Sequence, residues 1–266
     1  MKNLTLASTL LATTTLASPA FAQSQFFEDI EIRSQADTVT EYVFRGQSLG
    51  AQSLVSDTEV TLPIGLSGGF KYIAGIDPDS AVQRDEIRVY VNYSVPVGDA
   101  VSVDVGGTHF YYPQFGGLFE TRGGSAGSYE AYGSVGFNEV FLKPKARVSY
   151  DVTLENLTIE GSVEHSFDLS REGWSANVGL TAGYVDADNN FLGFANSLDY
   201  GWGTATAGFN KVITDNISFY GDANFTLNSE DDTLNFDREV LASGFDFATR
   251  DSDTKLWFAT GVVLNF

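Results

Sequence analysis

The stretch from Lys255 to Phe266 reads K-L-W-F-A-T-G-V-V-L-N-F and ends the sequence. Its apolar residues recur at every second position, so a β-strand would carry them on one face. They are Leu256, Phe258, Val262, Leu264 and Phe266. A strand that ends a chain has an unpaired edge, and a barrel removes that edge by pairing the last strand with the first. The stretch therefore predicts a closed β-barrel.

In a bilayer, the apolar face of this strand would contact lipid, and Phe266 would lie near the water interface. The stretch resembles the C-terminal signature of bacterial outer-membrane proteins, in which a terminal Phe marks the strand read by the assembly machinery. The resemblance implies that Phe266, Leu264, Val262 and Phe258 form an assembly signal. It also implies periplasmic chaperones and the barrel-assembly machinery as partners during biogenesis.

The first residues have the pattern of a secretory signal peptide. Met1-Lys2 is a short basic start, an apolar stretch runs from Leu4 to Leu16, and Ala20-Phe21-Ala22 is an A-x-A cleavage signal. We therefore expect residues 1–22 to be cleaved after export by the Sec route, which leaves 23–266 as an outer-membrane barrel. The apolar stretch is too short to span about 30 Å of hydrocarbon as a helix.

Composition supports the same class of protein. Twenty-seven glycines, 21 phenylalanines and 12 tyrosines are typical of strands, tight turns and aromatic girdles. No stretch of 18 apolar residues follows the signal peptide, so no membrane-spanning helix is expected. The absence of cysteine requires another source of stability, which a closed hydrogen-bonded barrel supplies. A formal charge of −20 argues against nucleic acid and suits a surface among divalent cations and lipopolysaccharide.

Alternating segments separated by turn residues predict an all-β, antiparallel up-and-down transmembrane barrel of about twelve strands. The first segment covers 38–46, or starts from as early as residue 29, and its two faces are not distinct. The other expected strands are 53–62, 66–76, 86–95, 101–112, 129–137, 142–152, 157–169, 174–185, 197–209, 217–227 and 255–266.

The connections alternate in length, which is a second sign of an outer-membrane barrel. With a periplasmic N-terminus, the connections 63–65, 96–100, 138–141, 170–173 and 210–216 are periplasmic, and all are short. The longest ones, 113–128, 186–196 and 228–253, fall at the extracellular end.

The short turn from Thr153 to Asn156 predicts a register for the two strands that it joins. In this register Val148 faces Gly161 and Tyr150 faces Ile159 on the lipid side. On the other side, the expected pairs are Arg147 with Ser162, Lys145 with Glu164 and Ser149 with Glu160. One face is therefore apolar and the other carries opposite charges, as expected for a lumen.

The segment Glu41-Tyr42-Val43-Phe44-Arg45-Gly46-Gln47-Ser48 resembles the opening strand of the TorF-like porin family of proteobacterial outer-membrane proteins. Tyr111-Tyr112-Pro113 and Ser128-Tyr129-Glu130-Ala131-Tyr132 are similar to mid-chain features of that family. The chain departs from it in Glu41, where Asp is usual, and in the acidic segment 228–253. The resemblance implies a barrel with channel function, without a known solute.

The candidate functional residues are charged side chains expected to line the pore, with roles in size and charge selectivity. They are Arg45, Glu86, Arg88, Lys143, Lys145, Arg147, Glu160 and Glu164. Two alternatives stay open, because a twelve-stranded barrel lies between filled and open sizes. The charges either line an open pore or neutralise one another in a plugged one.

We expect no catalytic, metal or cofactor site. His165 shares a face with Val163 and Phe167, away from Ser166 and Glu164, and no acid lies near His109. Both histidines are therefore expected to act as interfacial aromatic residues. Residues 186–197 begin like a calcium loop but lack the required Gly and Glu. The acidic loop 228–253 is expected to be a solvated surface loop, with the hypothesis that its aromatic residues fold into the mouth.

The sequence thus predicts an outer-membrane porin-like channel of a Gram-negative bacterium for passive diffusion of small hydrophilic solutes or ions. Acidic mouth loops predict a weak cation preference. The alternative is a closed structural barrel whose extracellular loops bind lipopolysaccharide, ions or another partner. An outer-membrane enzyme is disfavoured by the placement of the histidines.

Overall fold

The computed structural model describes residues 30–76, 85–95, 97–113, 127–187, 199–229 and 254–266. No helix in these ranges is long and apolar enough to cross a membrane. The predictions for the signal peptide, for most of the loop 113–128, for the calcium-like segment beyond residue 187 and for the acidic loop beyond residue 229 lie outside the described residues.

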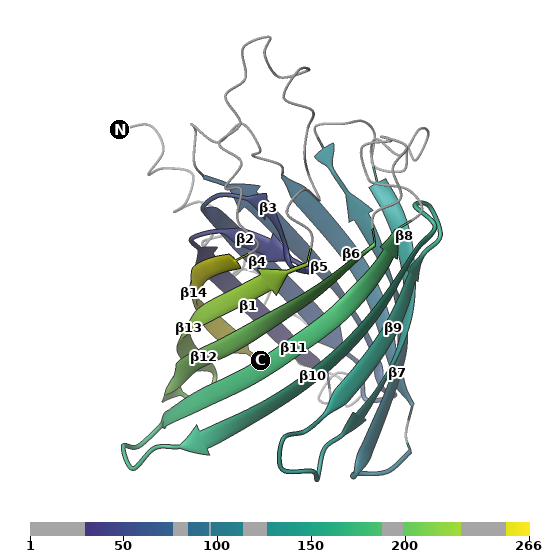
Figure 1. Cartoon of the computed structure of the whole chain (residues 1–266). Coiled ribbons are helices and arrows are strands. Elements are labelled where there is room, and N and C mark those ends of the chain that lie inside the picture. The colour runs from purple at the N-terminus through teal and green to yellow at the C-terminus, as the bar shows by residue number, and fades with distance from the viewer. Residues whose placement is uncertain (1–29, 77–84, 96, 114–126, 188–198, 230–253) are drawn as a thin grey trace.

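Twelve of the strands in the described ranges form a closed barrel (Figure 1). They are β1 (Glu31–Val39), β4 (Ser53–Thr61), β5 (Leu66–Gly75), β6 (Glu86–Val95), β7 (Val101–Tyr111), β8 (Gly127–Phe137), β9 (Lys145–Asp151), β10 (Asn156–Asp168), β11 (Trp174–Ala187), β12 (Tyr200–Thr214), β13 (Ile217–Asn228) and β14 (Thr254–Asn265). Two short strands, β2 (Tyr42–Phe44) and β3 (Gln47–Gly50), form a separate hairpin.

The barrel has the predicted antiparallel up-and-down topology. Each barrel strand pairs with its neighbours in sequence, and β1 pairs with β14 to close the ring. Closure reaches the last residue: the Ile32 N–H donates to the Phe266 carbonyl at 3.0 Å, and the Phe266 N–H donates back at 2.9 Å. The prediction that the last strand pairs with the first is confirmed.

The two faces of the wall also follow the predicted alternation. On β6, Val89 and Val91 point outward with 48% and 52% of their surface exposed, while Glu86 points inward with 2% exposed. On β14, Leu256 and Phe258 are likewise exposed on the outside, at 59% and 49%. The outside of the barrel is therefore apolar and the lumen polar.

The connections differ between the two ends of the barrel as predicted. One end carries the short connections 62–65, 96–100, 138–144, 169–173 and 215–216. The other end carries 40–52, 76–85, 112–126, 188–199 and 229–253, together with the short turn 152–155.

Two details of the sequence-based prediction are wrong. The first strand is Glu31–Val39, and the motif around Tyr42 to Ser48 lies in the hairpin that follows it. The apolar and polar residues of that motif do not alternate clearly, because a hairpin inside the barrel has neighbours on both faces.

The register of β9 with β10 is also shifted by two residues. Tyr150 pairs with Leu157, Arg147 with Glu160 and Lys145 with Ser162. The cause is the turn, in which the Asp151 carboxylate accepts hydrogen bonds from the N–H groups of Thr153 and Leu154 at 2.9 and 2.8 Å. A shift of two residues changes the partners and preserves the faces.

Candidate functional site

The hairpin β2–β3 lies in the connection between β1 and β4, and its ends are fixed to the barrel wall. The Thr40 N–H donates to the Phe258 carbonyl at 2.9 Å, and the Thr40 hydroxyl accepts from the Phe258 N–H at 2.9 Å. On the far side, the Ile76 N–H donates to the Gln52 carbonyl at 3.0 Å. The chain between these anchors is therefore held at the upper end of the barrel in Figure 1.

The turn of the hairpin places Arg45 and Gly46 at its tip. Both have positive φ angles, of 50° and 79°. Positive φ at both central residues is the geometry of a type I′ turn, whose twist suits a two-residue hairpin. The sequence Phe44-Arg45-Gly46-Gln47 therefore forms a tight turn, with Phe44 paired to Gln47.

Arg45 reaches from this tip to the wall at β8 and β9. Its Nη2 donates to Glu130 Oε2 at 2.6 Å and to the Ser149 hydroxyl at 3.0 Å. The other carboxylate oxygen of Glu130 accepts from Arg147 Nη2 at 3.3 Å. Only 2% of the Glu130 side chain is exposed. One buried carboxylate thus binds two guanidinium groups, one from the hairpin and one from the wall.

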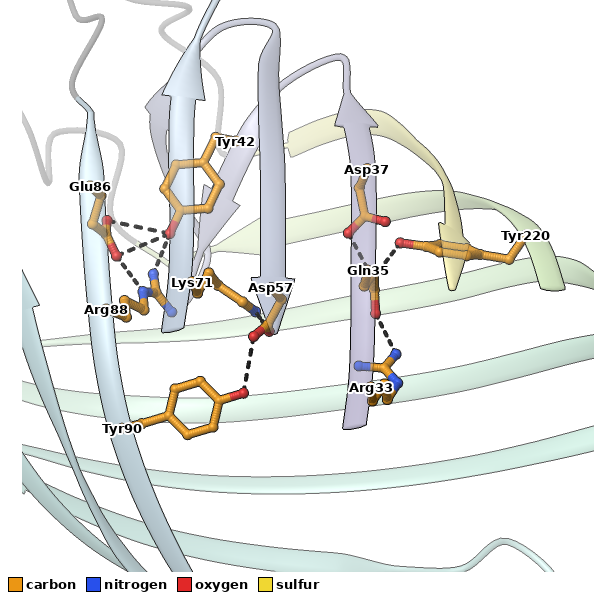
Figure 2. A network of polar contacts seen from close by, with 10 residues as sticks. All are labelled: Arg33, Gln35, Asp37, Tyr42, Asp57, Lys71, Glu86, Arg88, Tyr90 and Tyr220. Carbon is orange, nitrogen blue, oxygen red and sulfur yellow. Dashed lines mark hydrogen bonds and ion pairs between the residues drawn. The ribbon is translucent and has the colours of Figure 1, made fainter. Parts of the chain in front are cut away.

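A second contact joins the hairpin to β6 (Figure 2). The Tyr42 hydroxyl lies 3.4 Å from Glu86 Oε2, and Arg88 donates to both Glu86 and the Tyr42 oxygen. The Arg88 guanidinium lies over the Phe44 ring at 4.2 Å and over the Phe110 ring at 4.9 Å. Burial raises the pKa of the Tyr42 phenol well above its usual value, so the hydroxyl stays protonated and can donate to Glu86.

A third contact lies on β12 and β13. The Asn228 side-chain amide donates to the Gly46 carbonyl at 3.3 Å. Gly46 also packs directly on Trp202, so a Cβ at this position would overlap the Cβ of Trp202. Because the hairpin touches β6, β8 and β9 as well as β12 and β13, it crosses the lumen.

Below the hairpin, the wall from β1 to β9 carries a series of paired charges. Asp57 binds Lys71 at 2.9 Å and accepts from the Tyr90 hydroxyl at 3.0 Å. Further along the wall, Asp104 binds Lys145 at 3.1 Å. Figure 2 shows the Asp57 cluster beside the Tyr42 contact, with all its side chains pointing inward.

The opposite wall, formed by β11 and β12, is uncharged where it faces the lumen. The inward residues between 175 and 183 and between 202 and 210 are Ser, Thr, Asn, Gly and Trp. The Thr204 and Thr226 hydroxyls lie 2.9 Å apart, and Thr206 donates to Asn224 at 2.7 Å. The lumen therefore has one wall rich in paired charges and one polar wall, on β11 and β12, that carries no charge of its own. Beside the latter, Asp222 of β13 accepts from the Asn177 amide at 3.0 Å.

The structure brings together most of the candidate residues. Glu86, Arg88, Lys145, Arg147, Glu160 and Glu164 all lie on the inward face of their strands, and Arg45 lies at the hairpin tip inside the barrel. Lys143 is the exception: it lies in the connection between β8 and β9 with a φ of 40°, so its placement on a strand is wrong.

The partners of these charges differ from the predicted ones. Arg147 binds Glu130 and Lys145 binds Asp104, on β8 and β7, whereas Ser162 and Glu164 on β10 were the expected neighbours. Glu130, Asp104 and Tyr42 were not among the candidate residues predicted from the sequence. The alternation on β8 could have placed Glu130 in the lumen, but nothing local indicates that Arg45 reaches it.

The histidines lie outside the lumen, among aromatic side chains. His109 stacks on Tyr129 with ring centroids 4.3 Å apart, and His165 lies 4.2 Å from the Phe141 ring. His165 Nδ1 is 2.8 Å from the Phe141 carbonyl. These contacts place both histidines among aromatic side chains on the outer face, and their position at the membrane interface stays a prediction. Within the described part of the chain, no group of three or more His, Cys, Asp or Glu residues could hold a metal ion.

A closed, antiparallel twelve-stranded barrel with an apolar outside and a polar lumen defines the fold class of outer-membrane β-barrel proteins. The chain belongs to the family described as bacterial protein of unknown function (Gcw_chp), whose model matches residues 29–236. This description differs from the TorF-like name suggested by the opening motif, which stays a prediction. No curated protein matches the chain in sequence.

Three of the solved structures that share this fold are as follows. The KdgM porin in complex with disordered oligogalacturonate is 9% identical, with a TM-score of 0.53 over 89% of this chain and 99% of that one. LpxR from Salmonella typhimurium is 10% identical, with a TM-score of 0.50 over 87% and 99%. An outer-membrane channel from Pseudomonas putida F1 is 10% identical, with a TM-score of 0.50 over 89% and 94%. What they share with this chain is the fold.

Proposed function

We propose that this protein is a porin-like channel of the Gram-negative outer membrane, through which small hydrophilic solutes or ions diffuse passively. The hairpin from Tyr42 to Gly50 forms its constriction. The observation that carries this proposal is a polar lumen, crossed at one end by an anchored hairpin, inside a wall whose outer surface is apolar.

The outer surface supports the membrane location. Large apolar side chains point outward on all sides of the ring: Val91 is 52% exposed, Ile159 51%, Leu180 53% and Phe258 49%. Such a band would be unfavourable in water and is stable in hydrocarbon. Lipid and lipopolysaccharide are then the surroundings of the barrel. Export by the Sec route and insertion through the C-terminal signal at Phe258, Val262, Leu264 and Phe266 complete the proposal.

The charges of the lumen support a weak cation preference. Arg88 and Lys145 each bind a carboxylate of their own, whereas Arg45 and Arg147 share Glu130, which leaves one positive charge at that contact. Glu160 and Glu164 face the lumen on β10 and take part in none of the ion pairs among the described residues. Unneutralised carboxylates favour the entry of cations.

Single-channel conductance of the refolded chain 23–266 in a planar bilayer tests this function. We expect discrete current steps, and a reversal potential in a salt gradient that shifts toward the cation value. Replacing residues 42–50 with a Gly/Ser linker of equal length should raise the conductance of each step. Anion selectivity would contradict the proposed lining.

A closed barrel is the second candidate, and the three anchors of the hairpin favour it. In this case the extracellular loops bind lipopolysaccharide, ions or another partner, and nothing passes the lumen. Absence of current from the native chain, together with large steps from the linker variant, would establish that the hairpin closes the barrel. Absence of current from both would refute the channel.

A further inference from the structure

The place where Arg45 binds has the make-up of a guanidinium site. Glu130 and Ser149 both accept from Arg45 Nη2, at 2.6 and 3.0 Å, and they are 4% and 2% exposed. A guanidinium group and a carboxylate form strong charge-assisted hydrogen bonds, and a second acceptor beside them adds geometric selectivity. We call Glu130, Ser149 and Arg147 the arginine seat.

The group that occupies the arginine seat belongs to a segment outside the barrel ladder. β2 and β3 pair only with each other in the sheet order, and the barrel closes without them. The contacts of the hairpin with the wall described above are made by side chains and by the Gly46 carbonyl. The hairpin can therefore leave without breaking a hydrogen bond of the barrel ladder.

The wall also keeps its charges paired when the hairpin leaves. Breaking a buried ion pair is strongly unfavourable when it leaves one charge alone. Here Glu130 keeps Arg147 at 3.3 Å, and Glu86 keeps Arg88 on the same strand. The arginine seat therefore remains formed, and Glu130 Oε2, the oxygen that Arg45 leaves, is available to another guanidinium group.

We propose that the arginine seat is a solute-binding site for guanidinium compounds and that Arg45 occupies it as a tethered competitor. A solute with a guanidinium group displaces Arg45, the hairpin loses its charged anchor, and the path through the lumen widens. The proposal rests on the proposed channel function. A short tether gives Arg45 an effective concentration on the order of millimolar, so a free solute competes in the millimolar range.

The test uses agmatine, which carries one guanidinium and one ammonium group, and cadaverine, which carries two ammonium groups, as the matched control. Both are added at constant ionic strength to channels of the native chain in a planar bilayer. A channel whose hairpin has left the arginine seat should show a larger conductance state. We expect agmatine, and not cadaverine, to raise the fraction of time that the channel spends in this state. Equal effects of the two amines would overturn the proposal, because they would indicate general cation binding.

Three variants locate the effect. Arg45→Gln empties the arginine seat, so the larger state should dominate without agmatine, and agmatine should not increase it further. Glu130→Gln removes the acceptor and should abolish the response to agmatine. Glu172→Gln, a charge change in the turn between β10 and β11, should respond like the native chain. A native response from Glu130→Gln would refute the arginine seat.

A second readout does not depend on conduction. Trp202 is covered by Gly46, so departure of the hairpin should expose its indole to acrylamide in the detergent-refolded protein. We expect agmatine to increase quenching in the native chain and not in Glu130→Gln. Such a response in a barrel that never conducts would support the site while refuting the channel, so the two proposals can fail separately. No change in quenching would refute the site itself.

Discussion

Gly46 is the position where the smallest substitution should release the hairpin. It has a φ of 79°, and a Cβ there would overlap the Cβ of Trp202 and lie 3.1 Å from its Cγ. The Cβ of Trp202 is bonded to the backbone, so rotation of the indole cannot relieve the overlap. Gly46→Ala should therefore push the hairpin tip away from β12.

The size of the effect follows from the backbone term alone. A left-handed conformation is about 1–2 kcal/mol less favourable for Ala than for Gly. The charge-assisted hydrogen bond from Arg45 to Glu130 contributes roughly 1.5–3 kcal/mol, so the two terms are of similar size. A change of 1–2 kcal/mol shifts an equilibrium by about 5–30-fold, and the overlap with Trp202 adds to this shift.

The assay is acrylamide quenching of tryptophan fluorescence, together with single-channel conductance. The chain has three tryptophans, and of these Trp202 lies under the hairpin tip. We expect stronger quenching and more frequent large conductance steps in Gly46→Ala. Heat-modifiable migration on gels should show that the barrel of this variant is still folded.

Gly98→Ala is the matched control, because Gly98 has a φ of 118° but its Cβ would meet nothing within 4 Å. It tests a Gly→Ala change at a positive φ in the turn between β6 and β7, away from the hairpin. Quenching and conductance of Gly46→Ala that equal those of Gly98→Ala would refute the packing of the hairpin on Trp202.

Four further predictions concern the wall and the hairpin contacts. Val91→Arg places a charge on the outer face and should destabilise the barrel by about 2–4 kcal/mol in urea refolding, whereas Ser162→Arg on the lumen face should change it little. Arg147→Gln leaves Arg45 of the hairpin as the guanidinium partner of Glu130 among these ion pairs, so single-channel records should show the larger conductance state less often. More frequent visits to that state would contradict the sharing of Glu130 by the two arginines. Tyr42→Phe removes one donor and should release the hairpin less than Gly46→Ala, by the same quenching assay. Because burial raises the pKa of Tyr42, the contact of its phenol should be fully present below a pH of about 10 and weaken only above it; loss at neutral pH would contradict this.

Much of the fold could be predicted from local patterns. β6 begins and ends at the predicted residues, Glu86 and Val95, because apolar and polar residues alternate along its whole length. The faces of β9 and β10 were predicted correctly for the same reason. Their register was not, because it depends on the turn that the Asp151 carboxylate stabilises, and alternation contains no information on turn geometry.

The candidate site was predicted in part. Alternation placed Glu86, Arg147 and Glu164 on the lumen face, since inward orientation is a local property of a strand. The partners of these charges lie on other strands, so the expected pairs of Arg147 and Lys145 were wrong. Arg45 was selected as a candidate and lies inside the barrel, but it was placed at the end of a strand instead of at a hairpin tip.

The sequence by itself determined the barrel, its number of strands and the two faces of its wall, because each depends on a period of two residues and on turn residues that lie close together in the chain. Only the tertiary structure decided that residues 42–50 cross the lumen and that Arg45 shares Glu130 with Arg147. Those contacts join segments 85 and 17 residues apart. The contact of Arg45 with Glu130 depends on closure of β1 on β14, which brings the walls around one lumen, whereas Arg147 and Glu130 lie on the neighbouring strands β9 and β8.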